Sequence, residues 1–344
     1  MSVGVVGLGL IGGSIALGLR DKFEVIGVDL DPETLRIASE KGICHKVSRE
    51  LSALKGADVV FVAVPINSVC SIVRELAPYG MAIADVGSLK LDITNALRDV
   101  PTFIGTHPMA GREKGGIAAS DGTLFENALW MVDRTRPKEL IEKVTGYIEA
   151  LGAYTFLLDP NSHDQMVAAV SHLPHLVAVA LTLAAERIAK GDDRLFLMAA
   201  GGFRDTTRIA SGDPELWQQI LSQSPYLKDA AQVFLDVFQT LCAADHLTSY
   251  LQEACSIREK LPFKGRGVVG EIFSLVIKVE DKPGAIGEVT SILAGRHINI
   301  KEIEILKQRE GETGPLRLGF ATAEKALEAY SLLKELGYTL ETRW

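Results

Sequence analysis

Short apolar runs separated by amphipathic stretches fill the first half of the chain. VGVV (3–6), VVFVAV (59–64), AIADVG (82–87) and TFIGTH (102–107) are mostly apolar, as strands buried on both faces of a sheet are. Helical patterns lie between these runs, which is the alternation that a doubly wound parallel sheet requires. The pattern therefore predicts an α/β domain of this kind over residues 1–160.

The hydrophobic pattern changes near residue 159. Helical periodicity then continues to about residue 260 without an intervening strand pattern. Residues 166–185 carry no formally charged side chain, and a stretch of this length is about long enough to span a bilayer. Because it is rich in alanine and contains polar residues, we interpret it as a helix buried between subunits or domains. The sequence predicts an all-helical second domain at residues 161–262 that forms a homodimer.

A glycine-rich hinge, KGRGVVG (264–270), precedes the last part of the chain. The patterns that follow are a strand, a helix, two strands, a helix and a strand, from FSLVIKVE to YTLETRW. This βαββαβ order predicts a ferredoxin-like domain at residues 270–344. A small module behind a hinge is more often regulatory or assembling than catalytic.

Composition narrows the classes of partner. The 344 residues have a net charge of -8 and no dense Lys/Arg cluster, which argues against binding to nucleic acid. Four scattered cysteines lack metal-ligand spacing, so we expect reduced thiols, no metal site and a cytoplasmic location. The first residues have no basic region ahead of an apolar core, so we expect neither a signal peptide nor a membrane anchor.

The sequence GLGLIGGS (7–14) contains the glycine pattern of a dinucleotide-binding loop. It follows a predicted strand and opens a predicted helix, as a Rossmann fold requires. The next strand ends at Asp29, 22 positions after Gly7, where a carboxylate can bond the ribose hydroxyls. Leu30 follows in place of an arginine, so we predict NAD rather than NADP. The expected cofactor contacts are Gly7, Gly9, Leu10, Ile11, Gly12, Asp29 and Pro65.

Three residues lie just after predicted strand ends, where ligands of parallel sheets bind. They are Pro65, Ser88 and His107. His107 lies within GTHPMAG (105–111), a setting suited to proton transfer. Taken alone, Ser88 is more simply interpreted as the N-cap of the following helix, and it could have both roles.

Polar residues also interrupt the helical region at equal spacings. His172 and His175 lie three apart in SHLPH, and Asp205 and Arg208 lie three apart in FRDTTRIA. Either pair fits a ligand site. A histidine on an apolar helix is more often a satisfied core contact, and Asp and Arg at this spacing usually form an ordinary ion pair, so the spacing alone leaves the matter open.

Taken together, these motifs resemble the prephenate dehydrogenase family of tyrosine biosynthesis. The resemblance covers about residues 1–260 and rests on GLGLIGGS, Asp29, DVGSLK, GTHPMAG with Glu113, SHLPH, and GFRDTTRIAS ahead of Trp217. The last domain resembles the ACT domain, an amino-acid-sensing module, through DKPGAIGEVTSILA. The chain departs from the family's frequent Asp and Asn after the tryptophan, where it has Gln219 and Ser224.

The resemblance implies NAD-dependent oxidative decarboxylation of prephenate to 4-hydroxyphenylpyruvate. It assigns proton abstraction to His107, with Ser88 helping to position His107 and the substrate hydroxyl. It makes Arg208 the partner of the ring carboxylate, and it places His175, and less surely His172, beside the pyruvyl side chain. Glu113, Asp205 and Trp217 would line or gate the pocket.

The sequence leaves open the substrate, the role of the ACT domain and two other classes of protein. Arogenate differs from prephenate only in bearing an amine for the keto group, far from the reacting carbon. The ACT domain would bind tyrosine near Pro283, Gly284 and Asn299, or would only assemble subunits. Another Rossmann hydroxyacid dehydrogenase and a non-catalytic amino-acid-responsive protein are the remaining alternatives.

Overall fold

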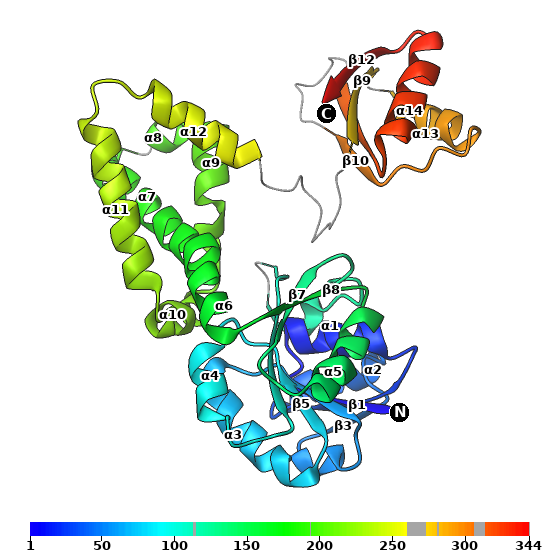
Figure 1. Cartoon of the computed structure of the whole chain (residues 1–344), viewed down its shortest axis with the longest axis vertical. Coiled ribbons are helices and arrows are strands. Elements are labelled where there is room, and N and C mark those ends of the chain that lie inside the picture. Colours follow the sequence, from blue (N-terminus) through cyan, green and yellow to red (C-terminus); the bar gives the residue numbers. More distant parts are fainter. Residues whose placement is uncertain (113–114, 193, 260–272, 281, 306–313, 344) are drawn as a thin grey trace. The chain divides into compact units, whose positions relative to one another are not determined.

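A computed structural model describes residues 1–112, 115–192, 194–259, 273–280, 282–305 and 314–343. The chain divides into two compact units, Met1–Tyr250 and Leu251–Trp344. The first contains the α/β domain and most of the helical region (Figure 1). We describe each unit by itself.

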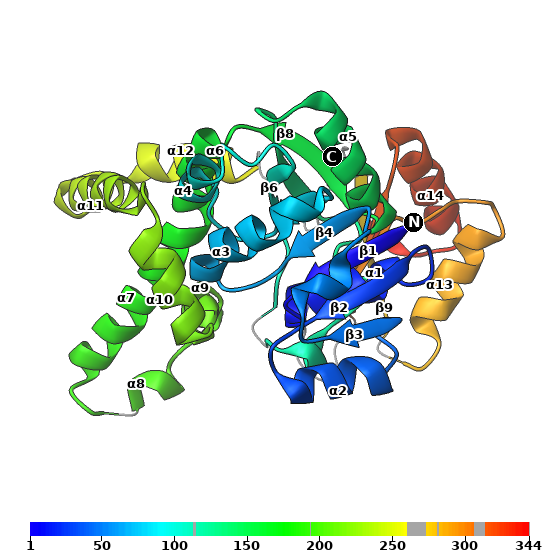
Figure 2. The same cartoon turned by 90° about the horizontal axis from the view of Figure 1, so that it is seen from below.

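An eight-stranded sheet forms the centre of the α/β domain, in the order β3-β2-β1-β4-β5-β6-β7-β8. All neighbouring strands pair in parallel except β6 and β7, which are antiparallel. Figure 2 shows the first four strands side by side. The strands are β1 (Ser2–Val6), β2 (Glu24–Val28), β3 (Lys46–Ser48), β4 (Val59–Val62), β5 (Ala82–Asp85), β6 (Phe103–Pro108), β7 (Leu129–Asp133) and β8 (Tyr154–Leu158).

Helices cover both faces of this sheet because its strands are apolar on both sides. Val3 and Val5 of β1 belong to the core beneath α1 and α5, whereas Val6 belongs to the core beneath α3 and α4. This alternation follows from the two-residue period of a strand. The helices are α1 (Leu10–Leu19), α2 (Pro32–Glu40), α3 (Ile66–Leu76), α4 (Leu91–Ala96) and α5 (Lys138–Ala150), with short turns η1 (Leu51–Leu54), η2 (Ala77–Tyr79) and η3 (Ile117–Ala119).

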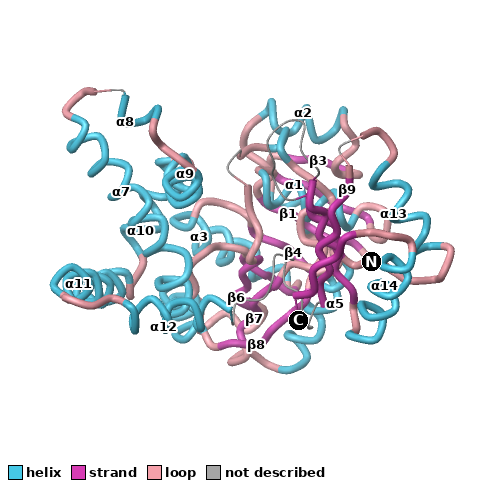
Figure 3. Tube along the Cα trace, turned by 90° about the horizontal axis from the view of Figure 1, so that it is seen from above, coloured by secondary structure: helices cyan, strands magenta, loops and turns pink. Residues whose placement is uncertain are grey.

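The second part of the first unit is helical, as predicted. Figure 3 shows only helices and loops from α6 to α11 in the described chain. The elements are α6 (Pro160–Val167), η4 (Ala168–His172), α7 (Leu173–Ala189), α8 (Arg194–Leu197), α9 (Gly201–Thr207), η5 (Arg208–Ser211), α10 (Pro214–Gln223) and α11 (Leu227–Ala243). The helix α12 (Thr248–Glu259) follows across the boundary between the two units.

The uncharged stretch expected to be buried lies in Pro160–Ala189. By length and composition this helix could cross a membrane, a test that core helices of soluble proteins also pass, and 28% of its apolar window is buried. Its first half is anchored, because His163, Asp164 and His172 are each only 1% exposed. Its second half leaves apolar side chains such as Leu183 and Ile188 exposed in the single chain. The predicted burial of this half between subunits or domains therefore stays a prediction.

The second unit contains the predicted βαββαβ fold. Its sheet has the order β10-β11-β9-β12 with antiparallel pairing throughout, and α13 and α14 pack against an apolar core. The elements are β9 (Phe273–Val279), α13 (Ala285–Ala294), β10 (Glu302–Ile305), β11 (Gly314–Phe320), α14 (Ala323–Glu335) and β12 (Thr339–Arg343). The three predicted fold classes are thus confirmed, whereas the domain boundaries at 160, 262 and 270 stay predictions.

Candidate active site

The glycine loop between β1 and α1 has the shape of a dinucleotide cradle. Gly7 has a φ of +85°, and a Cβ at Gly12 would lie 1.8 Å from the Gly7 carbonyl oxygen. Only glycine fits these two positions. Gly9 is the N-cap of α1, and an added Cβ there would meet no described atom within 4 Å. The open side of the loop therefore lies at the helix N-terminus, where backbone N–H groups attract a pyrophosphate.

Asp29 lies at the end of β2, beside this loop. Its carboxylate accepts hydrogen bonds from the backbone N–H groups of Leu8, at 2.7 Å, and of Asp31, at 2.9 Å. Carboxylate oxygens each have further acceptor capacity, so Asp29 can also bond ribose hydroxyls. Leu30 is 76% exposed and brings no positive charge for a 2'-phosphate. The cradle fits NAD.

The remaining predicted cofactor residues flank the cradle. Leu10 and Ile11 form the first turn of α1 and are partly buried. Pro65 is the N-cap of α3, directly after β4. Because β1 and β4 are neighbours in the sheet, Pro65 lies at the same edge as the glycine loop.

His107 lies near the end of β6, where its ring meets a histidine from the helical region. Nδ1 of His107 is 2.9 Å from Nε2 of His163, and the two rings meet edge to face. His163 lies in α6, 56 positions later in the chain. The contact therefore joins the α/β domain to the helical domain at the predicted proton-transfer residue.

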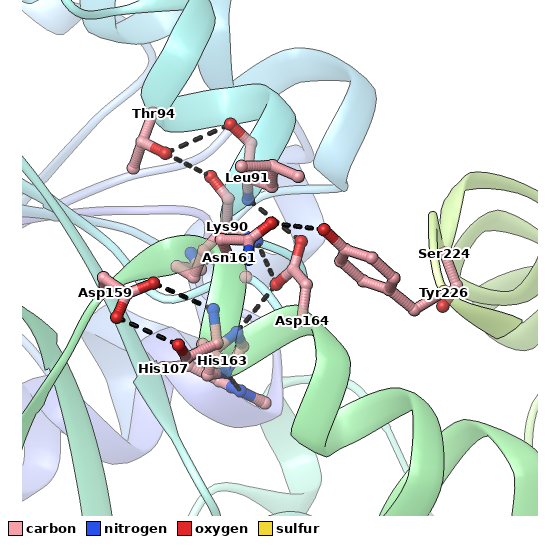
Figure 4. A network of polar contacts seen from close by, with 12 residues as sticks. Lys90, Leu91, Thr94, His107, Asp159, Asn161, His163, Asp164, Ser224 and Tyr226 are labelled. Carbon is pink, nitrogen blue, oxygen red and sulfur yellow. Dashed lines mark hydrogen bonds and ion pairs between the residues drawn. The ribbon is translucent and has the colours of Figure 1, made fainter. Parts of the chain in front are cut away.

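A carboxylate completes this contact on its far side (Figure 4). Nδ1 of His163 is 2.7 Å from Oδ1 of Asp164. The Asp164 carboxylate also accepts the backbone N–H groups of Lys90 and Leu91, each at 2.9 Å, at the start of α4. Lys90 is fully buried and forms an ion pair with the equally buried Asp85 of β5. These groups tie β5, α4, α6 and β6 together.

The pKa values of the site histidines keep the rings neutral. Burial lowers the pKa of His107 well below its ordinary value, and His163, Lys90 and His172 lower it further. Burial lowers the pKa of His172 to about 4, although Asp164 opposes the shift. Burial also lowers the pKa of His175. A neutral imidazole is the form that accepts a proton.

His172 and His175 make different contacts within the helical domain. Nδ1 of His172 is 2.9 Å from the hydroxyl oxygen of Ser224, one of the positions where the chain departs from the family pattern. The His175 ring stacks on Trp217, with centroids 3.6 Å apart. Among the residues that the structure describes, Nδ1 of His175 is a buried atom without a hydrogen-bond partner. Such an atom suits a polar group of a ligand.

The other predicted residues lie around this arrangement. Ser88 is half-buried between β5 and α4, while Asp205 and Arg208 are exposed at the end of α9 and the start of η5. The turn that begins at Arg208 ends at Gly212, where an added Cβ would lie 2.5 Å from the Trp217 indole nitrogen. Arg208 thus begins a segment that reaches the His175–Trp217 stack. Glu113 lies outside the described residues.

The sequence interpretation missed His163, Asp164, Lys90 and Asp85. One available signal was the His-Asp pair in the first turns of a helix that then becomes uncharged. No local pattern in the sequence identifies His107 as the partner of His163 and Asp164, because His107 lies in the α/β domain. The roles assigned to the predicted site residues stay predictions.

Comparison with known proteins identifies the family. Residues 15–157 match the prephenate dehydrogenase nucleotide-binding domain, 159–253 its dimerization domain, and 273–326 the ACT domain. The prephenate dehydrogenase of Bacillus subtilis (strain 168) is 32% identical over 94% of this chain and 95% of its own length. The chain belongs to the prephenate dehydrogenase family. It is an NAD-dependent oxidoreductase, and the predicted family and cofactor are confirmed.

Two solved structures resemble the chain over about three quarters of its length. Prephenate dehydrogenase from Aquifex aeolicus, in complex with hydroxyphenyl propionate and NAD+, is 29% identical with a TM-score of 0.70, covering 76% of this chain and 98% of that one. Arogenate dehydrogenase from Synechocystis is 33% identical with a TM-score of 0.67, covering 76% of this chain and 99% of that one. The family therefore includes members named for either substrate.

Proposed function

We propose that this protein oxidises and decarboxylates prephenate to 4-hydroxyphenylpyruvate, with NAD as the hydride acceptor. The observation that carries the proposal is the neutral His107 at the carboxyl edge of the sheet that also bears the dinucleotide cradle. Similarity to the Bacillus subtilis prephenate dehydrogenase over nearly the whole chain supports the choice of substrate.

The reaction requires a proton acceptor beside the cofactor. Prephenate carries a ring hydroxyl opposite a carbon that bears a carboxylate. His107 takes the hydroxyl proton, and bound NAD would supply the acceptor for the hydride of the hydroxyl-bearing carbon. The ring carboxylate then leaves as carbon dioxide, and its electron pair completes the aromatic ring while the oxygen regains a proton. Aromatisation makes this sequence favourable.

The remaining side chains orient the substrate in this proposal. Arg208 binds the ring carboxylate, because a guanidinium offers two parallel N–H groups to it. Ser88 contacts the substrate hydroxyl near the nicotinamide. His175, with its unpaired buried nitrogen, and His172 face the pyruvyl side chain. Asp205, Trp217 and Glu113 line the pocket.

Arogenate is the second candidate substrate, favoured by the similarity to the Synechocystis arogenate dehydrogenase. Its side chain carries an ammonium group, which binds best beside a negative charge. The lowered pKa values of His172 and His175 make these rings neutral groups, which suit a keto oxygen. The choice of prephenate therefore rests on these two rings and on the similarity to the Bacillus subtilis enzyme, whereas the Asp205 and Glu113 carboxylates would suit an ammonium group.

The helical domain forms a homodimer in this proposal. Its helices expose a set of large apolar side chains on the single chain, as interfaces that are permanently covered do. The match of residues 159–253 to a dimerization domain supports the same assignment. Sedimentation of the purified protein tests it, and a monomer at all concentrations would contradict it. The exposed set includes Leu181, Leu183 and Ile188 of α7 and Val233, Val237 and Phe238 of α11.

The ACT domain binds tyrosine as a feedback inhibitor in this proposal. Gly284, with a φ of +90°, is the N-cap of α13, and Pro283 and Asn299 are exposed on either side of that helix. The free cysteines of the described chain fit a reducing cytoplasm, where tyrosine synthesis would take place.

One assay tests these assignments together. NADH formation is followed with prephenate and with arogenate, each with and without tyrosine. Faster turnover of prephenate and inhibition by tyrosine are the expected results. Preference for arogenate would reverse the substrate choice, and activity with neither compound would refute the proposed reaction.

A further inference from the structure

The two nitrogens of His107 have different surroundings. Nδ1 faces Nε2 of His163, and the other nitrogen of His163 faces Asp164. His163 and Asp164 are 1% exposed, whereas His107 is only half-buried. The three side chains thus form a line that runs from the interior of the protein toward the accessible ring of His107 (Figure 4).

The hydrogen-bonding capacity of Asp164 determines where the protons in this line lie. Backbone N–H groups of Lys90 and Leu91 point at its two oxygens, so Asp164 acts as an acceptor. Nδ1 of His163 must therefore carry a hydrogen and donate it to Asp164. With its one hydrogen on Nδ1, His163 has its lone pair on Nε2, which accepts from Nδ1–H of His107. The lone pair of His107 is left on Nε2.

We propose that His163 and Asp164 are positioning residues that hold His107 in the Nδ1–H tautomer, so that its Nε2 takes the substrate proton. The inference rests on the proposed function for its catalytic consequence, but the tautomer itself is a property of the free protein. A histidine locked in the opposite tautomer would present an N–H group to the substrate and could not act as a base.

The same line of bonds joins His107 to a carboxylate after it has taken the proton. A positive charge on its ring meets the lone pair of His163, whose other side is bonded to the Asp164 carboxylate. Lys90, His172 and a charged His163 each disfavour this charge, and the Asp85 carboxylate lies beside Lys90. Asp164 is thus the carboxylate that hydrogen bonds join to His107 through His163.

Asp164 also has a structural role, which the experiment must separate. Its bonds to the start of α4 hold α6 against the α/β domain, and Asp164→Asn would weaken one of them. The side chain of His163 is not needed for these backbone bonds. His163→Phe removes both ring nitrogens and keeps an aromatic ring, while His163→Gln restores a polar atom that can accept from His107. Asp159→Asn, at the N-cap of the same helix, is the matched control for Asp164→Asn.

The test combines kinetics with nitrogen NMR of full-length protein labelled with ¹⁵N-histidine. His107→Asn identifies the His107 signals, and their shifts distinguish Nδ1–H from Nε2–H. We expect Nδ1–H in the wild type and a shift toward Nε2–H in His163→Phe and Asp164→Asn. In these two variants we expect kcat to fall by roughly a hundredfold or more, with KM values nearly unchanged. We expect partial recovery of kcat in His163→Gln and none of these changes in Asp159→Asn.

Two results would overturn the proposal. One is an Nε2–H tautomer for His107 in the wild type. The other is a combination of two observations: His163→Phe keeps the wild-type kcat, whereas Asp164→Asn loses both thermal stability and activity. That combination would leave Asp164 with a structural role only. If the wild type oxidises neither prephenate nor arogenate, the proposed function fails, whereas the NMR result still decides the tautomer.

Discussion

The dinucleotide cradle and the histidine network, which comprises His107, His163, Asp164, Lys90 and Asp85, lie at the same edge of the sheet. The first consists mostly of backbone groups, and the second mostly of side chains. The cradle is mostly backbone from one continuous stretch, β1 to α1, with the Asp29 carboxylate bonded back to it. The network consists of side chains from β5, β6 and α6 and the start of α4, including partners 56 and 74 positions apart. The cradle depends on the absence of side chains at two positions, and the network depends on which atom carries each proton.

This difference separates cofactor binding, which we assign to the cradle, from proton transfer, which we assign to the histidine network. Backbone N–H groups and a helix N-terminus attract a pyrophosphate whatever the pH, because they do not titrate. The histidines change charge with pH, and the low pKa values that burial gives them keep the proton acceptor ready. Changes in the network should therefore alter the rate, whereas changes in the cradle should alter cofactor affinity.

The largest effect is expected for His107→Asn. Removal of the proton acceptor should lower kcat by roughly 100- to 10,000-fold, the usual contribution of a general base. The dissociation constant of NAD, measured by fluorescence titration, should stay close to the wild-type value because the cradle is intact. A loss of only a few fold in kcat would contradict the assigned role.

A smaller effect, on substrate affinity, is expected for Arg208→Gln. A guanidinium that holds the ring carboxylate before and during the reaction contributes to both states equally, so its loss raises KM more than it lowers kcat. We expect KM for prephenate to rise by roughly ten- to a hundredfold, or about 1.4 to 2.7 kcal/mol. Arg204→Gln, which alters an exposed arginine of the preceding helix α9, is the control. An unchanged KM would count against this carboxylate partner.

The same contrast explains what the sequence could predict. The cradle lies within a few consecutive residues, and each of its elements has a local pattern, so its position and its cofactor followed from the sequence. The strand ends were less well defined, since β4 ends at Val62 although the apolar run continues to Val64. The carboxyl edge was nevertheless correctly placed, because parallel strands all end there.

The network could not be predicted because its contacts join distant parts of the chain. The family resemblance suggested Ser88 as a residue that helps to position His107, and that role stays a prediction, but nothing in the sequence suggested that Nδ1 of His107 faces His163. Likewise, Ser224 was noted only as a departure from the family pattern, and its bond joins the C-cap of α10 to His172 at the end of η4. Hydrogen-bond partners 52 or more positions apart leave no periodic signal in the sequence.

A pair of glycine variants tests the cradle. In Gly12→Ala the added Cβ collides with the backbone oxygen of Gly7, so both thermal stability and NAD affinity should fall. In Gly9→Ala the Cβ enters open space in the protein itself but lies where the pyrophosphate approaches. We expect an unchanged melting temperature and a roughly tenfold weaker affinity for NAD, about 1.4 kcal/mol, in Gly9→Ala. Wild-type NAD affinity in that variant would show that the cofactor binds elsewhere.

The last prediction concerns the pH dependence of stability. The pKa of His172 is about 4 in the folded protein and about 6.5 in an unfolded chain. As the pH falls below 6.5 the unfolded chain binds a proton that the folded protein does not, so the free energy of unfolding decreases until pH 4. His172→Gln keeps a polar group for Ser224 but does not titrate, and its unfolding free energy should decrease less between pH 7 and 5. Urea unfolding at both pH values measures this difference.

The decrease of the unfolding free energy should not vanish in the variant, because burial lowers the pKa values of His107 and His175 in the same direction. Equal decreases of the unfolding free energy in the variant and the wild type would mean that burial of His172 does not disfavour its charged form. The contribution of His172 to stability would then be independent of pH, like that of the cradle.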